Sequence, residues 1–159
     1  MAGPTPSSPC LLLHQAVPDS SFTAAPFLPA PAEDLLQAGH FNKEVEVIIG
    51  TNKDEGLDSI ITAWSDPNFY SNVRDNWDTL VPPRLLGLMR ESDVTAEDVE
   101  KSHKILDFYV GGLENITEAN VQGLINMMTD SEMLYGVDKT VGYLMEQGVT
   151  VYQYILTHR

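Results

Sequence analysis

The stretch VEVIIGTNKDEGL, residues 45–57, decides how this chain is interpreted. Its branched apolar residues lack polar alternation, which is typical of a strand covered on both faces in a parallel sheet. A glycine ends the apolar run, and Asp54 and Glu55 come after it, before a second glycine. In open α/β sheets, functional side chains gather just past the carboxyl ends of strands. Glu55 is therefore a candidate functional residue, and the alternative is a solvated acid at the positive end of the next helix.

The end of the sequence, VTVYQYILTHR, predicts a second strand because it is rich in β-branched and aromatic residues. A long helical segment separates the two strands, and such a crossover favours a parallel pairing. We therefore predict an α/β fold in which Val45–Ile49 and Val151–Leu156 are neighbouring parallel strands.

Capping signals and prolines divide the crossover into helices. GLDSIITAW begins the first one, and several prolines interrupt the helical segment after it. TAEDVEKSHKILDFYVGG indicates the clearest helix, with Thr95 as its cap and Gly111 at its end. A further helix is expected over Glu118–Met128. The capping-box pattern TDSE at Thr129–Glu132 predicts the start of the last helix, which runs to Gly148.

The amino-terminal part is predicted to be irregular. Residues 1–31 hold most of the ten prolines together with many Ser, Thr and Ala residues, so they indicate an extended lead-in. PAEDLLQAG then predicts a short helix from Pro31 to Gly39. The N-terminus lacks the basic region of a signal peptide, and no apolar run reaches membrane-spanning length. Taken by itself, the chain is expected to be cytoplasmic.

The composition argues against several kinds of partner. A formal net charge of −14 and a pI near 4.4 would repel a phosphate backbone, so no nucleic-acid partner is expected. The single cysteine, Cys10, permits no intrachain disulfide and no thiolate metal cluster. No pair of histidines among His14, His40, His103 and His158 has the spacing of metal ligands, so neither a metal nor another cofactor is expected.

Other side chains have ordinary explanations. His103 and Asp107 share a predicted helix face, and a solvated pair explains them. No serine lies in a G-x-S-x-G turn, so the usual nucleophile elbow is absent. The sequence NIT makes Asn115 a candidate glycosylation site if the chain is secreted. Four methionines are expected to fill the core: Met127, Met128, Met133 and Met145.

A family resemblance adds to this interpretation. The stretch PFLPAPAEDLLQAGHFNKEVEVIIGTNKDEGL, residues 26–57, closely resembles the type-B carboxylesterases, the group that includes the cholinesterases. The similarity continues through EKSHKILDFYVGG, MMTDSEMLYG and TVGYLMEQGVTVYQYILTHR. The resemblance implies an α/β-hydrolase fold that is incomplete, with an irregular leader at residues 1–16 and a partial domain at residues 17–159.

In that family, the glutamate of the KDEG motif is the acid of a Ser–His–Glu triad, so the resemblance implies this role for Glu55. A carboxylate there would hold an imidazole in the correct tautomer and stabilise it once protonated. The family's serine elbow and oxyanion loop precede the similar region, and its catalytic histidine comes after the second strand, so His158 is not that histidine. The resemblance thus implies a partial carboxylic ester hydrolase that carries the triad acid and is inactive alone.

Two hypotheses stay open at this point. Full-length relatives of the first kind act on carboxylic esters and are often secreted or membrane-associated. The alternative is a non-catalytic relative like the neuroligin-type adhesion proteins, which reuse this fold to bind a protein partner. The two groups differ chiefly at the serine elbow, so that segment would discriminate between them.

Overall fold

The computed structural model describes residues 18–88 and 93–157, and the chain divides into two compact units, Met1–Phe41 and Asn42–Arg159. In the first unit, residues 18–31 form no helix or strand, as the lead-in prediction required. The carboxylate of Asp19 holds this loop by accepting hydrogen bonds from two backbone N–H groups, which lower its pKa. The predicted leader at residues 1–16 lies outside the described residues.

The short helix of the first unit is confirmed. Helix α1 (Ala32–Gln37) begins directly after Pro31, and Glu33 and Asp34 lie in its first turn, where the helix dipole favours negative charge. Gly39 ends it with a φ of 66°, a left-handed conformation that glycine adopts without steric cost.

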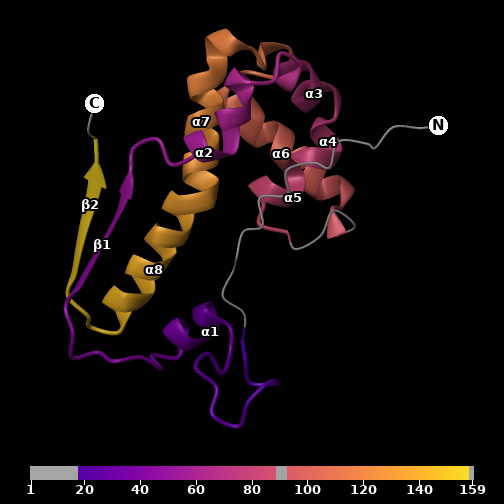
Figure 1. The fold of residues 1–159 in the computed structure, drawn as a ribbon. Helices are drawn as coiled ribbons and strands as arrows, with labels where there is room; N and C mark the ends of the chain where they lie inside the picture. Colours follow the sequence, from indigo (N-terminus) through magenta and orange to yellow (C-terminus); the bar gives the residue numbers. More distant parts are fainter. Residues whose placement is uncertain (1–17, 89–92, 158–159) are drawn as a thin grey trace. The chain divides into compact units, whose positions relative to one another are not determined.

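The second unit contains the predicted pair of parallel strands. Strand β1 (Val47–Asn52) pairs in parallel with β2 (Val151–Leu156), so that the first residues of the two strands are partners and so are the last. β1 begins two residues later than predicted and continues into the acidic loop. Figure 1 shows the strands side by side with helix α8 along them, and the other helices of this unit toward the carboxyl ends of the strands.

Between the strands the described part of the chain is mostly helical, in agreement with the predicted helical crossover. Short 3₁₀ turns cover Ile61–Trp64, Leu113–Asn115 and Glu118–Asn120. The helices are α2 (Leu57–Ile60), α3 (Phe69–Asp75), α4 (Trp77–Leu80), α5 (Pro82–Leu85), α6 (Ala96–Tyr109), α7 (Val121–Thr129) and α8 (Tyr135–Glu146).

Helix α6 agrees closely with its sequence signals. The Thr95 hydroxyl accepts the Asp98 N–H, and the Asp98 carboxylate accepts the Thr95 N–H, which completes a capping box. The Thr95 hydroxyl also donates to the Asp98 carboxylate at 2.6 Å. This bond first, and then the one from the Thr95 N–H, lower the pKa of Asp98. Gly111 comes after the helix with a φ of 87°, in agreement with the predicted end.

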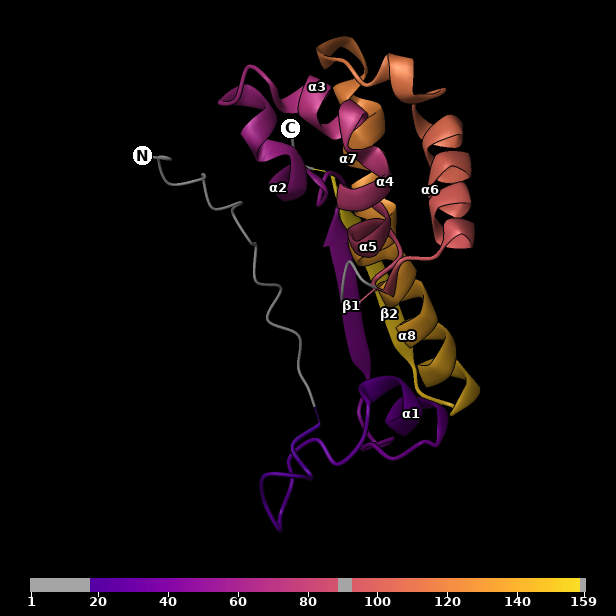
Figure 2. The same ribbon diagram turned by 90° about the vertical axis from the view of Figure 1, so that its right-hand side faces the viewer.

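The prediction of a helix start at TDSE is wrong. Thr129 ends α7, and the chain continues through a π-helical turn, Asp130–Leu134, directly into α8 (Figure 2). The Thr129 hydroxyl does not cap; it donates to the Ile125 carbonyl one turn back, at 2.8 Å. A hydroxyl used in this way is compatible with a continuous helix, whereas an N-cap requires extended backbone.

The core lies among the helices. Trp77, Leu106 and Ile116 are almost fully buried at its centre. The Trp77 indole N–H donates to the buried Ser102 hydroxyl at 2.9 Å, and that hydroxyl donates to the Val99 carbonyl, so the polar atoms in this apolar surrounding are paired.

The sheet is less covered than the sequence predicts. α8 packs on the face of β1 that carries the buried Thr51, whereas the opposite face is open. On that face Ile48 is 73% exposed and Tyr152 and Tyr154 are each 54% exposed, so the prediction of a strand covered on both faces is wrong for the described residues. The methionine prediction is half right: Met127 and Met128 are buried, and Met133 and Met145 are exposed.

Candidate functional site

Glu55 lies three residues past the end of β1, in the turn that leads to α2. Its Oε1 accepts two hydrogen bonds at 2.8 Å, one from the Asn52 backbone N–H and one from the Asn52 side-chain Nδ2. No residue of the described part of the chain bonds to Oε2 through an identified contact. The half-buried carboxylate is therefore anchored through one oxygen, which leaves the other oxygen available to a donor.

The side of β1 on which this carboxylate lies can be deduced from the strand pairing. The Val47 N–H donates to the carbonyl of Thr150, the residue just before β2, and the Lys53 N–H donates to the carbonyl of Leu156 in β2. Because N–H groups alternate in direction along a strand, the Asn52 N–H points away from β2. Glu55 thus lies at the carboxyl end of β1 and at its outer edge.

Gly56, the next residue, fits the loop closely against α7. Its N–H donates to the Thr129 hydroxyl at 2.9 Å. A Cβ on Gly56 would lie 2.3 Å from the Ile125 carbonyl oxygen and 2.5 Å from the Thr129 nitrogen. The φ of Gly56 is −65°, so glycine is required here for space and not for an unusual backbone conformation.

A polar network lies one turn further on. The Ser59 hydroxyl donates to Glu132 Oε2 at 2.5 Å and accepts from Arg84 Nη2 at 2.7 Å. Arg84 Nε donates to the other oxygen of Glu132 at 2.5 Å. Three residues from α2, α5 and the π turn therefore form a closed ring of charge-assisted hydrogen bonds.

The histidine prediction needs a correction. His103 does not pair with Asp107; its Nε2 lies 2.7 Å from Asp78 Oδ1, which belongs to α4. Asp107 is exposed one turn further along the same helix. Packing of α4 beside α6 brings in a partner 25 residues away, and helical spacing alone does not reveal it.

Asn115 lies at the end of a 3₁₀ turn and is half-buried. Its Nδ2, the atom to which a glycan would be attached, donates to the Gly111 carbonyl at 2.9 Å. Ile116, the middle residue of the sequon, is fully buried. Glycosylation at Asn115 stays a prediction.

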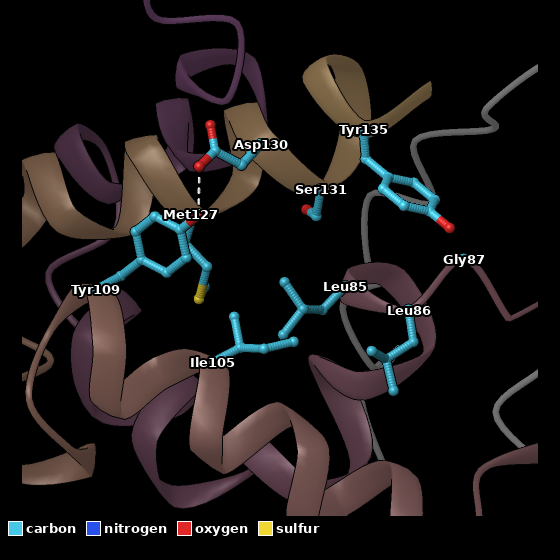
Figure 3. A pocket seen from close by; sticks show the side chains of 9 residues that line it. All are labelled: Leu85, Leu86, Gly87, Ile105, Tyr109, Met127, Asp130, Ser131 and Tyr135. Atoms are coloured by element: carbon cyan, nitrogen blue, oxygen red, sulfur yellow. Dashed lines mark hydrogen bonds between the residues drawn. The ribbon is translucent and has the colours of Figure 1, made fainter. Parts of the chain in front are cut away.

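A pocket of about 510 Å³ lies on the other side of α7 (Figure 3). Tyr109 and Met127 flank one end of it, Tyr135 stands at the other, and Leu85 lies between them. The Tyr109 hydroxyl donates a very short bond to Asp130. Burial, and then this bond to the carboxylate, raise the pKa of Tyr109 to about 12.

The pocket and the loop of Glu55 contact different faces of α7 and of the π turn that follows it. Met127 and Asp130 line the pocket, whereas Ile125, Met128 and Thr129 contact Gly56. The volume is within the range of small-molecule sites, about 300–1,000 Å³. Glu55 is not among the residues that line this pocket.

Across residues 18–88 and 93–157, no group of three or more His, Cys, Asp or Glu side chains could hold a metal ion. Within that part of the chain, none of the helices combines the length and the apolar character needed to cross a bilayer.

Comparison with known proteins identifies the family of this chain. The model of the carboxylesterase family matches residues 8–159. The chain belongs to the carboxylesterase family. Juvenile hormone esterase of Tribolium castaneum is 29% identical over 126 residues, which are 77% of this chain and 21% of that protein. The chain therefore spans about a fifth of the length of this curated relative. No solved structure matches it.

Membership of the carboxylesterase family confirms the resemblance seen in the sequence, and it implies an α/β-hydrolase fold. The parallel β1–β2 pair with its helical crossover is consistent with part of that fold. Sequence reasoning proposed Glu55 as a site residue but gave no indication of the residues that hold its loop: Asn52, Thr129, Ser59, Arg84 and Glu132. Asn52 has a local signal, because it lies three residues from Glu55. Thr129, Arg84 and Glu132 have none, since they meet this segment only in the folded chain.

Proposed function

We propose that this chain belongs to a carboxylic ester hydrolase in which Glu55 is the acid of the catalytic triad. The observation that carries the proposal is the geometry of the Glu55 carboxylate. It lies at the carboxyl end of a parallel strand, and Asn52 fixes one of its oxygens with two donors. The other oxygen is left for an imidazole N–H, which is the bond that a triad acid makes.

In this chemistry, the histidine takes a proton from a serine hydroxyl as the serine oxygen attacks the ester carbonyl. The alcohol leaves with that proton, and a water molecule then attacks the acyl-enzyme and releases the carboxylic acid. Glu55 would hold the imidazole in the correct tautomer and stabilise its protonated form in both steps. The proposed substrate is therefore a carboxylic ester, and the reaction needs no cofactor.

The serine and the histidine are proposed to come from polypeptide outside these 159 residues, as the order of the family's motifs implies. Several described hydroxyls and imidazoles already have other partners. Ser102 is bonded to Trp77 and Val99, Ser59 is bonded within its polar network, and His103 is bonded to Asp78. The 159-residue chain alone is accordingly expected to hydrolyse no ester.

The test compares two proteins with a p-nitrophenyl ester as substrate. The 159-residue chain should release p-nitrophenol no faster than an inert protein does. In the longest gene product that contains these residues, Glu55→Gln should lower kcat by about 10⁴-fold, the loss seen for a triad acid. The control is Asp54→Asn, which removes the adjacent carboxylate and should change kcat only a few-fold.

Two results would overturn the proposal. One is rapid hydrolysis by the 159-residue chain that disappears when one of its own serines is changed. The other is a Glu55→Gln enzyme with full activity. A longer gene product without any esterase activity would instead favour the non-catalytic, partner-binding alternative.

A further inference from the structure

We propose that Thr129 and Glu132, at the π-helical turn after α7, are positioning residues that clamp the Glu55 loop at two points. The inference rests on the proposed function, because it assigns these residues to the placement of the triad acid. Neither residue is hydrogen-bonded to Glu55 itself. Each acts on the backbone or side chain of a residue just after Glu55.

The first point of the clamp is the Gly56 amide. The Thr129 hydroxyl accepts this N–H at 2.9 Å and donates its own hydrogen to the Ile125 carbonyl at 2.8 Å. Thr129 is only 2% exposed, so no solvent competes for these bonds. A hydroxyl can accept one hydrogen bond and donate another in this small space. Valine has the same shape as threonine but can do neither.

The second point is the Ser59 hydroxyl. It donates to Glu132 at 2.5 Å, and Arg84 closes the ring by donating to both residues. The two contacts have the same sequence separation of 73 residues. The segment after Glu55 and the segment after Thr129 therefore run side by side in the same direction, in contact at positions three residues apart.

The clamp has a direct consequence for Glu55. Its carboxylate is bonded to Asn52 on the strand side, and its neighbour Gly56 is bonded to Thr129 on the helix side. The loop is thus held at both ends of a short span. A catalytic group must stay within a fraction of an ångström of its working position, and support of this kind supplies that accuracy.

Backbone amides of the 159-residue chain report on the clamp without any catalysis. In Thr129→Val, the Gly56 amide loses its acceptor, and the freed loop no longer holds the Glu55 carboxylate against the Asn52 amide. Both amides should exchange with solvent roughly ten-fold faster, as expected for the loss of one hydrogen bond. The Lys53 amide between them is bonded to Leu156 and should keep its rate. Hydrogen exchange detected by NMR measures all three.

The controls separate positioning from general stability. Thr129→Ser retains the hydroxyl and should restore slow exchange. Thr140→Val removes a hydroxyl that makes the same backbone bond, to Gly136 at 2.8 Å, but that lies away from the loop. It should leave the Asn52 and Gly56 amides unchanged. Ser59→Ala, at a less buried position, should speed exchange at Asn52 even if a change at Thr129 prevents folding.

Equal acceleration at Lys53, Asn52 and Gly56 would overturn the clamp, since it would mean general loosening of the fold. Unchanged rates in both Thr129→Val and Ser59→Ala would also overturn it. In the longer enzyme, Thr129→Val should lower kcat roughly ten-fold with little change in KM, again the equivalent of one hydrogen bond, and serine should restore it. Failure of Glu55→Gln to affect turnover would refute the proposed function, and the exchange result would still stand.

Discussion

Gly56→Ala tests the close approach between the acidic loop and α7. The added methyl group would lie 2.3 Å from the Ile125 oxygen, 2.5 Å from the Thr129 nitrogen and 2.7 Å from the Met128 Cβ. The first two are backbone atoms of a buried helix and cannot rotate away as a side chain end can. Normal contact needs at least about 3.4 Å, so the loop must withdraw by about 1 Å.

Two effects add up in the loss of unfolding free energy that Gly56→Ala should cause. Overpacking of this kind costs about 1–3 kcal/mol. Withdrawal also stretches the bond from the Gly56 N–H to the Thr129 hydroxyl, which is worth about 0.5–1.5 kcal/mol. The free energy of unfolding should therefore fall by about 2–4 kcal/mol, a large part of the roughly 5–15 kcal/mol that is typical of a domain.

The matched control is Gly142→Ala. Gly142 lies in the interior of α8, and a Cβ there would meet no atom within 4 Å. Both substitutions reduce the entropy of the unfolded chain equally, so their difference isolates the contact. Gly142→Ala should stabilise the chain by about 0.5–1 kcal/mol.

Urea unfolding monitored by far-UV circular dichroism measures both variants. With a slope of about 2 kcal/mol per molar urea, the midpoint of Gly56→Ala should fall by roughly 1–2 M, and that of Gly142→Ala should rise slightly. A Gly56→Ala midpoint equal to or above the parent value would refute the inference that space, and not backbone conformation, demands glycine beside Glu55.

Three other predictions use separate parts of the fold. The raised pKa of Tyr109 means that this residue's contribution to stability is fully present below about pH 10 and is lost as the pH rises through about 12. Tyr109→Phe should therefore reduce the fall in unfolding free energy over that pH range by up to about 2 kcal/mol. An identical pH profile of the variant would contradict the role of Asp130 and burial. Thr95→Ala should cost about 1 kcal/mol in urea unfolding and raise the pKa of Asp98, whereas Thr95→Ser should do neither. Ile48→Lys places a charge on the open apolar face of the sheet and should increase the monomer fraction in size-exclusion chromatography with light scattering. Unchanged association would show that this face does not mediate self-association.

Local rules in the sequence were enough for several features of this carboxylesterase chain. The Thr95 capping box, the glycines after α1 and α6, and the two β-branched strands all depend on residues within a few positions of one another. The parallel pairing could also be predicted from the sequence, because a crossover of almost a hundred residues between two strands leaves room for the chain to return to the same end of the sheet. Family motifs, and not spacing, singled out Glu55.

Only the tertiary structure decided which partners the polar side chains have. The TDSE pattern looks like a helix start, but Thr129 is buried inside a continuous helix, where it bonds to Gly56, 73 residues away. His103 pairs with Asp78 across two helices, and not with Asp107 one turn along its own helix. Local patterns describe contacts within about four residues, whereas these partners are chosen by how whole helices pack. Apart from Asn52, the residues that hold the Glu55 loop in place could therefore be found only in the folded chain.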